Sequence, residues 1–368
     1  TTLYRIFLQS TGVTTDSRRC PAGSLFIALR GDTFDGNAFA AQALKDGCTH
    51  AVIDNPGYLP EGDPRYLLVD DCLKALQGLA RHHRRTLGTP IIGITGTNGK
   101  TTTKELTAAV LSQQYQLHYT QGNLNNHIGV PLTLLGLRPE HQLTVIEMGA
   151  SHPGDIRELV DIAEPDYGLI TNVGRAHLEG FGSFEGVIRT KGELFDYLRE
   201  KGGATVFVHD DNLYLKEMAH DLNQMRYGTQ TGLYVSGQMT DNSPYLTLQW
   251  KAEGETETHS VRTHLIGEYN LPNVLAAIAV GHYFHVTAEQ TDQALEGYIP
   301  HNNRSQLVRT AENVLIVDAY NANPTSMRAA IDNFRKMQAN HKMLILGDMR
   351  ELGSNSPALH QEIVDYLE

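Results

Sequence analysis

The sequence predicts an α/β protein of more than one domain, and three observations support this. The chain has 368 residues, of which 40% are hydrophobic and 20% charged, so it is long enough for two or three soluble domains. Apolar segments such as PIIGIT and LTVIEMG alternate with helical patterns, which is typical of a parallel sheet covered on both faces. A glycine-rich loop, GTNGKTT, follows one of these segments and leads into a helix.

The first part of the chain, residues 1–86, is predicted to be a small α/β domain. SLFIAL, THAVID and RYLLVDD are short apolar strands, and NAFAAQALKDG is a helix that ends at Gly47. A second helix is predicted over CLKALQGLARHHRRTL, because an aspartate precedes it and Gly88 follows it. LGTP, at residues 87–90, is a plausible linker.

Residues 87–299 are predicted to form the central domain. Its strands are PIIGIT, LTVIEMG, DYGLITNV and ATVFVHD, and helical patterns lie between most of them. The polar, alternating segment from Tyr234 to Gly267 instead indicates antiparallel hairpins attached to the parallel core.

Residues 300–368 are predicted to form a third domain. NVLIVDA and KMLILGD are expected strands, and PTSMRAAIDNFRKMQ and SPALHQEIVDYLE are expected helices. Two βα repeats are fewer than a doubly wound domain usually has, so we expect this domain to be incomplete.

Charge and cysteine content narrow the functional classes. Acidic residues outnumber basic ones by 42 to 30, which argues against a general nucleic-acid surface. The three cysteines, Cys20, Cys48 and Cys72, are isolated, which is typical of a reducing cytosol and indicates neither a disulfide framework nor a zinc site. No apolar run approaches 18 residues, so we expect a cytoplasmic protein without a membrane span.

The glycine-rich loop predicts a phosphate-binding loop. Its glycines allow backbone N–H groups to turn towards phosphate oxygens, Lys100 supplies a positive charge, and the Thr101 hydroxyl is suited to Mg²⁺. The spacing departs from the strict pattern, because Gly93 lies one residue too early. The alternative is a glycine-rich turn before a helix, which the strand–loop–helix context disfavours.

Two further residues follow strands of the predicted parallel sheet. Glu147 ends LTVIEMG, where a metal-holding carboxylate is expected beside the loop, and His177 follows the next strand. The alternatives are a solvated acid at a strand end and an ordinary surface histidine.

Lys191 lies in the middle of an apolar helical stripe that includes Val187, Leu194, Phe195 and Leu198. An ammonium facing a core is costly unless it is neutralised, paired or able to reach water. One possibility is that the aliphatic part of Lys191 packs in the core while its ammonium group reaches solvent. Another is that the ammonium pairs with Glu193, Glu147 or a substrate phosphate.

Five motifs resemble one family. GITGTNGKTT, IEMGASHPGDI, TNVGRAHLEGFGS, LIGEYNLPNVLAAIAVG and VDAYNANPTSMRAAID occur in the order found in Mur ligases, the ATP-dependent enzymes that build the peptide of bacterial cell-wall precursors. Within the family, GNLNNHIGVPLTLL and LGDMRELG are similar to the member that adds D-alanyl-D-alanine to UDP-N-acetylmuramoyl-tripeptide. The resemblance covers nearly the whole chain. It implies three domains: a UDP-binding α/β domain, a central ATPase domain, and a Rossmann-like domain that closes over ATP.

The resemblance also implies residue roles. Ser17 and Arg18 would contact the uridine diphosphate, and Asn125 and Asn126 would line the muramoyl-peptide channel. The triphosphate would be held by Gly96, Thr97, Asn98, Gly99, Lys100, Thr101 and Thr102. Thr101 and Glu147 would hold one Mg²⁺, and His177 and Lys191 would serve a second. Asn273 would bond the adenine, and Arg304 and Asp318 would close over ATP. Asn303 stands where the family pattern has a small residue.

The implied reaction activates a carboxylate as an acyl phosphate, which the amine of D-alanyl-D-alanine then attacks. Lys191 would carry a carbamate, since a neutral buried amine can take up CO₂ and become an oxygen ligand for Mg²⁺. We expect a cytoplasmic bacterial monomer that binds no nucleic acid. Two other hypotheses stay open at this point: a P-loop switch or motor, and a binding module that holds the UDP-linked substrate without catalysis.

Overall fold

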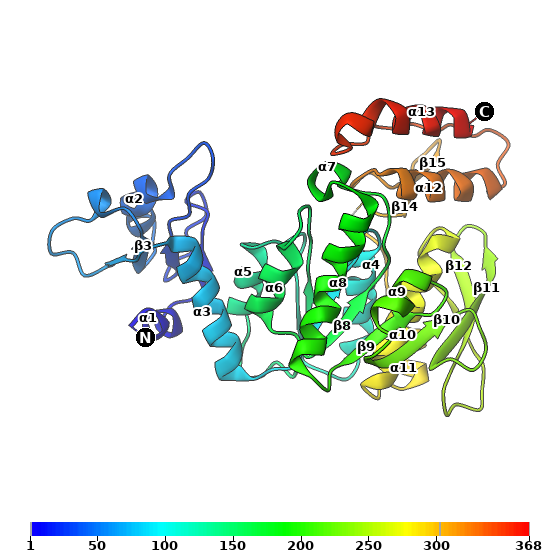
Figure 1. Cartoon of the computed structure of the whole chain (residues 1–368), viewed down its shortest axis with the longest axis horizontal. Helices are drawn as coiled ribbons and strands as arrows, with labels where there is room; N and C mark the ends of the chain where they lie inside the picture. Colours follow the sequence, from blue (N-terminus) through cyan, green and yellow to red (C-terminus); the bar gives the residue numbers. More distant parts are fainter. Residues whose placement is uncertain (1, 302, 368) are drawn as a thin grey trace. The chain divides into compact units, whose positions relative to one another are not determined.

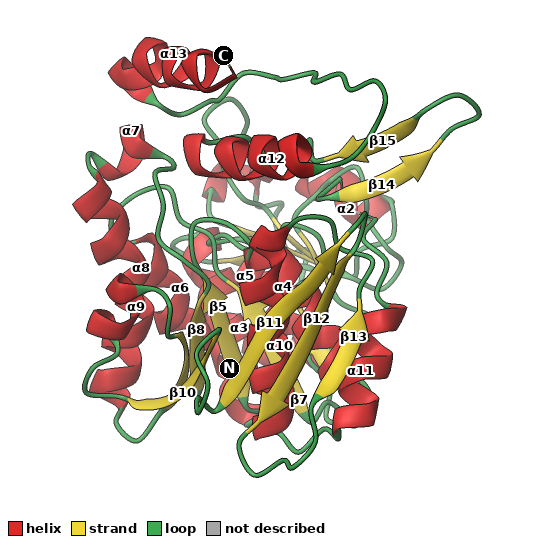
Figure 2. Ribbon diagram, turned by 90° about the vertical axis from the view of Figure 1, so that its right-hand side faces the viewer, coloured by secondary structure: helices red, strands yellow, loops and turns green. Residues whose placement is uncertain are grey.

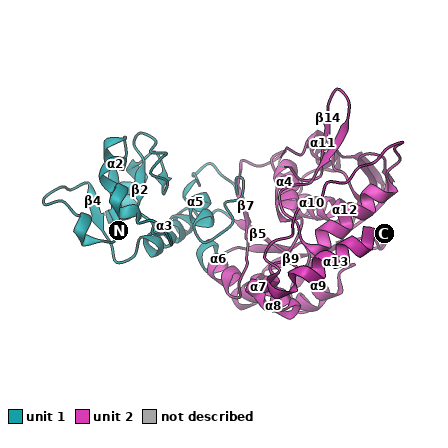
Figure 3. Cartoon of the chain, turned by 90° about the horizontal axis from the view of Figure 1, so that it is seen from above, with its two compact units in different colours: residues 1–89, 120–142, 161–164 teal, residues 90–119, 143–160, 165–368 magenta. Residues whose placement is uncertain are grey.

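The computed structural model describes residues 2–301 and 303–367 (Figure 1). The chain folds as two compact units (Figure 3). Unit 1 comprises residues 1–89, 120–142 and 161–164, and unit 2 comprises residues 90–119, 143–160 and 165–368. This division assigns residues 87–89, 120–142 and 161–164 of the expected central domain to unit 1, and it leaves the domain boundaries 86/87 and 299/300 as predictions.

Unit 1 contains a four-stranded parallel sheet of order β1-β2-β3-β4. The strands are β1 (Val13–Thr14), β2 (Leu25–Ile27), β3 (His50–Ile53) and β4 (Tyr66–Leu68). The helices are α1 (Thr2–Gln9), η1 (Gly36–Phe39), α2 (Ala40–Lys45), η2 (Pro56–Tyr58), α3 (Cys72–Leu87) and α5 (Gly129–Leu135). The limits predicted for α3 are confirmed: the Asp71 side chain accepts a hydrogen bond from the Lys74 N–H, and Gly88 ends the helix with φ of 69°.

Unit 2 is built on a nine-stranded sheet of order β13-β12-β11-β10-β9-β8-β5-β7-β6. Its strands are β5 (Ile91–Thr95), β6 (Leu117–Tyr119), β7 (Leu143–Glu147), β8 (Tyr167–Ile170), β9 (Thr205–His209), β10 (Asn223–Gly228), β11 (Val235–Asn242), β12 (Leu246–Ala252) and β13 (His259–Arg262). Every neighbouring pair from β6 to β11 is parallel, whereas β12 is antiparallel to both β11 and β13. The parallel core and the attached hairpins are therefore both as predicted.

Helices cover the parallel strands on both faces. One group is α4 (Lys100–Leu111), α10 (Leu271–Tyr283), preceded by η3 (Glu268–Asn270), and α11 (Ala288–Gly297); the other is α8 (Phe184–Lys201), preceded by α7 (Leu178–Phe181), and α9 (Leu213–Met218). α6 (Asp155–Ala163) joins β7 to β8. The side chains of Ile92, Ile94, Leu106 and Val110 are fully buried between β5 and the first helix group, which fixes the carboxyl end of β5 and the loop that follows it.

The carboxyl-terminal segment of unit 2 has little regular sheet. β14 (Gln306–Arg309) and β15 (Val314–Val317) pair only with each other and are antiparallel. α12 (Pro324–Lys336), η4 (Gly353–Asn355) and α13 (Ser356–Leu367) follow. The two helices pack around a small cluster of Ile331, Met349, Leu352, Leu359 and Ile363. Figure 2 shows α12 lying beyond one end of the strands of the large sheet.

The prediction of a strand at KMLILGD is wrong. Residues 342–348 have no regular structure, and Ile345 is 89% exposed. The strand predicted at NVLIVDA is confirmed as β15, and the two predicted helices are confirmed as α12 and α13, but β15 pairs only with β14. An apolar run becomes a strand only where a neighbouring strand satisfies its backbone N–H and C=O groups, and no described strand adjoins residues 342–348.

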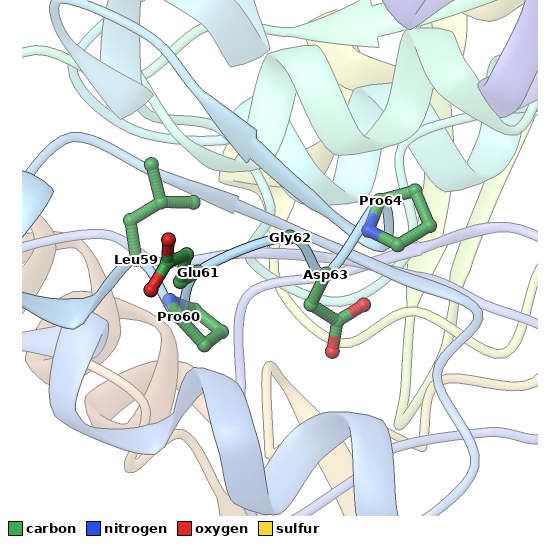
Figure 4. Close-up of a pocket in the computed structure, with 6 residues that line it drawn as sticks. All are labelled: Leu59, Pro60, Glu61, Gly62, Asp63 and Pro64. Carbon is green, nitrogen blue, oxygen red and sulfur yellow. The ribbon is translucent and has the colours of Figure 1, made fainter.

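No helix in the described residues is long and apolar enough to cross a bilayer. The loop from Leu59 to Pro64, between η2 and β4, surrounds a shallow hollow (Figure 4) that contains none of the predicted site residues.

Candidate active site

The loop between β5 and α4 requires glycine at two positions. Gly96 has φ of 141°, and a Cβ atom there would lie 2.0 Å from Thr171 Oγ1. Gly99 has φ of 77°, and a Cβ atom there would lie 2.5 Å from Asn273 Oδ1. Both positions therefore exclude side chains for conformational and steric reasons, as expected for a loop whose backbone approaches a ligand closely.

The loop is tied to the residues that follow β8. The Asn98 N–H donates to Asn172 Oδ1 at 3.0 Å, and the Thr171 hydroxyl donates to the Asn98 carbonyl at 2.6 Å. The Gly174 N–H donates to Thr97 Oγ1 at 2.9 Å. Sequence reasoning did not identify Thr171 or Asn172 as supports of this loop, although the position of TNVG directly after a parallel strand offered a signal.

Lys100 folds back onto its own loop. Its Nζ donates to the carbonyl oxygens of Gly96 at 2.8 Å and Thr97 at 2.9 Å. Burial lowers the pKa of Lys100 to about 8; the Glu147 carboxylate opposes this shift, and the Arg304 guanidinium adds to it. Lys100 thus lies in the electrostatic field of both residues.

Thr101 and Glu147 place two side-chain oxygen atoms next to each other at the carboxyl edge of the sheet. The Thr101 hydroxyl lies 3.2 Å from Glu147 Oε1, and only 8% of Thr101 and 1% of Glu147 are exposed. A hydroxyl and a carboxylate are the hard oxygen donors that Mg²⁺ prefers, so the predicted pair is brought together. Thr102 is also buried, in the first turn of α4.

His177 precedes α7 in a left-handed conformation, with φ of 49°. Its Nδ1 faces the carboxylate of Glu351 from the carboxyl-terminal segment. Burial lowers the pKa of His177; Glu351 opposes this shift, whereas Lys100 and Lys191 add to it. Glu351 was not predicted to have a role, because no sequence pattern indicates its meeting with a histidine so distant in the chain.

Lys191 is buried, as its position in an apolar stripe indicated, and its head does not reach water: the residue is 2% exposed. Its Nζ lies 3.4 Å from the Ala150 carbonyl oxygen and 5.3 Å from the centre of the Phe181 ring. Burial, followed by repulsion from Lys100, lowers the pKa of Lys191 well below its ordinary value, while Asp155 and Glu193 oppose this shift. Glu193 instead accepts hydrogen bonds from the backbone N–H groups of Gly154 and Arg157, at the start of α6.

Arg304 approaches the loop from the carboxyl-terminal segment. Its guanidinium stacks on the Tyr320 ring at 3.7 Å from the ring centre. Asn303, just before it, has φ of 57°, a left-handed conformation that asparagine adopts more readily than most residues. Asp318, by contrast, accepts a hydrogen bond from the Ser305 N–H at 3.4 Å and is exposed.

Asn273 lies beneath the loop. Its Oδ1 accepts a hydrogen bond from Thr103 Oγ1 at 3.1 Å, and its Nδ2 donates to Asn270 Oδ1 at 3.0 Å. In this structure the residue therefore supports the first turn of α4, and contact with adenine stays a prediction.

The predicted substrate residues lie in unit 1. Arg18 pairs with Asp16 at 2.9 Å in an exposed turn, where the Ser17 carbonyl accepts from the Cys20 thiol at 3.5 Å. Asn126 Oδ1 accepts hydrogen bonds from the N–H groups of Ile128 and Gly129, which positions the start of α5 beside Asn125.

Unit 2 therefore gathers three cationic side chains (Lys100, Lys191 and Arg304), the oxygen pair of Thr101 and Glu147, and His177. Such a concentration of positive charge at a phosphate loop favours a highly charged anion. In the part of the chain that the structure describes, no three His, Cys, Asp or Glu residues are grouped to hold a metal ion by themselves.

Three family models match the chain: "Mur ligase family, catalytic domain" at residues 9–84, "Mur ligase middle domain" at residues 94–281, and "Mur ligase, glutamate ligase domain" at residues 303–368. The UDP-N-acetylmuramoyl-tripeptide–D-alanyl-D-alanine ligase of Bacillus subtilis is 39% identical over 361 residues, which cover 95% of this chain and 76% of that protein. The ligase of the same name from Escherichia coli is 37% identical, over 95% of this chain and 77% of its own length.

Solved structures of related proteins are also similar to nearly the whole of this chain. A crystal structure of MurF from Acinetobacter baumannii superposes with a TM-score of 0.87 at 32% identity, covering 98% of this chain and 81% of that one. The MurF ligase from Thermotoga maritima in complex with ADP superposes with a TM-score of 0.86 at 27% identity, covering 98% and 82%. On these matches and on the arrangement of the phosphate loop, the chain belongs to the Mur ligase family.

Proposed function

We propose that this chain is an ATP-dependent ligase that joins D-alanyl-D-alanine to UDP-N-acetylmuramoyl-tripeptide. The observation that carries the proposal is the gathering of Lys100, Lys191 and Arg304 around a glycine-rich loop that also holds the Thr101–Glu147 pair. The relatives named for this reaction are similar over nearly the whole of this chain.

The reaction suited to this site has two steps. A carboxylate oxygen of the tripeptide attacks the γ-phosphorus of ATP, ADP leaves, and an acyl phosphate forms. The amine of D-alanyl-D-alanine then adds to the acyl carbon, loses a proton, and inorganic phosphate leaves. Both steps place negative charge on phosphoryl or carbonyl oxygens, which Lys100 and Arg304 would stabilise.

Two Mg²⁺ sites are part of the proposal. When bound, Mg²⁺ would neutralise charge on the phosphate oxygens. Thr101 and Glu147 fit one ion, since their oxygens lie 3.2 Å apart and are nearly buried. His177 and Lys191 would serve the other, but an ammonium at Lys191 would repel a cation. A carbamate on Lys191 would replace the buried cation with an anionic oxygen ligand, which removes this repulsion and whose charge the bound ion would neutralise.

The remaining residue roles are also proposals. Gly96, Thr97, Asn98, Gly99 and Thr102 would surround the triphosphate, with Asn273 at the adenine and Asp318 beside Arg304. Ser17 and Arg18 would contact the uridine diphosphate, and Asn125 and Asn126 would line the peptide channel. The enzyme would act as a monomer in the bacterial cytoplasm.

The test is phosphate release from ATP in four reactions: without the UDP-linked tripeptide, without D-alanyl-D-alanine, without both, and with both. A ligase releases phosphate at a high rate only when both are present, together with the product peptide. Turnover of ATP without either substrate would favour a P-loop switch or motor. Binding of the UDP-linked substrate without turnover in any reaction would favour the binding module.

A further inference from the structure

The first turn of α12 contacts the phosphate loop through one pair of side chains. Asn323 Nδ2 donates to Asn98 Oδ1 at 2.7 Å, and the reverse pair, Asn98 Nδ2 and Asn323 Oδ1, lies at 3.5 Å. Asn98 is in the middle of the loop, and Asn323 is 225 residues further along the chain, with an exposed fraction of 6%. This contact joins the carboxyl-terminal segment directly to the loop that would hold the triphosphate.

Both members of the pair are held in place by other hydrogen bonds. The Asn98 backbone is bound on both sides, its N–H to Asn172 Oδ1 and its carbonyl to the Thr171 hydroxyl and to Asn172 Nδ2. Asn323 is the N-cap of α12: its Oδ1 accepts from the Ser326 N–H at 2.9 Å, and its own N–H donates to Ser326 Oγ at 3.1 Å. Because the Asn98 backbone and the Asn323 side chain are already ordered, the hydrogen bond between the two amides costs less conformational entropy than one between free side chains.

A second contact lies beside the first. A Cβ atom on Gly174, in the loop after β8, would lie 3.2 Å from Thr325 Oγ1, so the first turn of α12 packs against that loop as well. The loop after β5 and the loop after β8 are hydrogen-bonded to each other through Thr97 and Gly174. A change in the conformation of the phosphate loop would therefore affect the first turn of α12 through two contacts, one at Asn98 and one at Gly174.

We propose that the Asn98–Asn323 pair is a latch that couples the phosphate loop to the carboxyl-terminal segment, with Asn323 acting as a positioning residue for nucleotide binding. The inference rests on the proposed function, because it assumes that the loop holds ATP. The latch keeps the first turn of α12, and with it the chain that carries Arg304, against the loop. Loss of the Asn98 amide leaves the buried Nδ2 group of Asn323 without this partner, which penalises the docked arrangement.

The first experiment needs no nucleotide. Hydrogen–deuterium exchange is measured at residues 323–327 in the wild type and in Asn98→Ala, which leaves α12 unchanged in sequence. The latch predicts faster exchange in N98A at these residues and unchanged exchange at α13, which is distant from the loop in sequence and does not contact Asn98. Equal exchange at residues 323–327 in both proteins would overturn the latch, whatever the chain binds.

The second experiment is a double-mutant cycle read by calorimetric titration with ADP and Mg²⁺. Asn323→Ser keeps an N-cap oxygen for α12 but is too short to reach Asn98. N98A and N323S should each weaken ADP binding by about three- to tenfold, the range of a single hydrogen bond. The double variant should bind ADP with about the same affinity as the single variant that binds it less tightly, since both changes remove the same contact. Effects that multiply would overturn the latch.

Two matched variants separate the latch from ordinary structural roles. Ser326→Ala removes the capping-box partner of Asn323 but leaves Asn98 untouched. Asn333→Ala removes another amide pair of α12, in which Asn333 Oδ1 accepts from Asn242 Nδ2 at 2.8 Å at the end of β11. Both should change ADP affinity less than about twofold. If either weakens binding as much as N323S, the effect belongs to helix capping or to general docking, and the latch is overturned. Absence of ADP binding by the wild type would instead refute the proposed function.

Discussion

Two apolar segments of similar composition differ in this molecule, because one forms a buried strand and the other is exposed and irregular. IIGIT forms β5 in the middle of the parallel sheet and is buried throughout, whereas MLIL, at residues 343–346, has no regular structure and exposes 79% of Met343. The difference lies in their neighbours, because β5 pairs with β7 and β8 while MLIL adjoins no described strand. Chain composition alone therefore does not determine a strand; pairing and burial do.

The same contrast applies to the site. Lys100, Thr101 and Glu147 follow or end buried strands, and their backbones are fixed by the sheet. Arg304, Asn323 and Glu351 reach the site from the carboxyl-terminal segment through a few side-chain contacts. We therefore expect substitutions of the residues held by the sheet to abolish most of the ligase activity. Substitutions of the residues from the carboxyl-terminal segment should lower the activity less.

The largest effect is expected for Lys100→Ala. The variant lacks the charge that we propose stabilises the transferring phosphate, so kcat should fall by about 10² to 10³, as for other preorganised electrostatic groups. The measurement is the rate of phosphate release with both substrates at saturation. A variant that keeps more than about a tenth of the wild-type rate, equivalent to only ~1.4 kcal/mol, would refute the role of the loop.

Lys191→Ala should lower kcat by about a hundredfold or more if a carbamate on Lys191 is a metal ligand. Added acetate or another short carboxylate should then restore part of the activity by supplying the missing oxygens. Mass measurement of the intact protein in bicarbonate should show a labile addition of CO₂ in the wild type and none in K191A. An unmodified wild-type lysine together with no rescue would disprove the carbamate.

Arg304→Lys should have a smaller effect, of about tenfold on kcat/KM. The lysine keeps the charge but loses the planar group that stacks on Tyr320. Binding of the UDP-linked substrate, measured by calorimetry, is the control and should not change. A loss as large as that of K100A would show that the residues from the carboxyl-terminal segment are as essential as those held by the sheet.

Lys100→Met should change how stability depends on pH. Because burial lowers the pKa of Lys100 to about 8 from an ordinary value near 10.5, the unfolded chain binds more protons than the folded one between these pH values. The group therefore disfavours folding below pH 8, and this penalty disappears as the pH rises towards 10.5. K100M should be more stable than the wild type at pH 7 by on the order of 1 kcal/mol, and this advantage should shrink at pH 10. Denaturant unfolding at the two pH values measures it, and an advantage that grows with pH would contradict the sign.

The smallest effect is expected for Ile345→Ser, which should change the free energy of unfolding by less than about 0.5 kcal/mol, because Ile345 is 89% exposed. The matched change is Ile94→Ala in β5, where Ile94 is fully buried and a loss of about 2 to 5 kcal/mol is expected. Denaturant unfolding of both variants compares them directly. A destabilisation by I345S similar to that by I94A would mean that MLIL is buried in solution.

The parts of the fold that local patterns determine could be predicted. The capped α3, the parallel strands from β5 to β9, the antiparallel hairpins and the burial of Lys191 all follow from periodicity, caps and apolar runs within one segment. The strand predicted at KMLILGD failed because pairing depends on distant residues. For the same reason the position of Asn273 beneath Gly99 and the meeting of Glu351 with His177 had no local signal.

The order of the large sheet has a consequence for how the protein behaves at high concentration. Its two outermost strands are short, with three residues in β6 and four in β13, whereas β11 has eight. A sheet edge exposes unpaired backbone groups that can bind the edge of another molecule and begin aggregation, and short edge strands limit this. We therefore expect that a variant in which β13 is extended into a long, flat edge strand would aggregate while it is still folded.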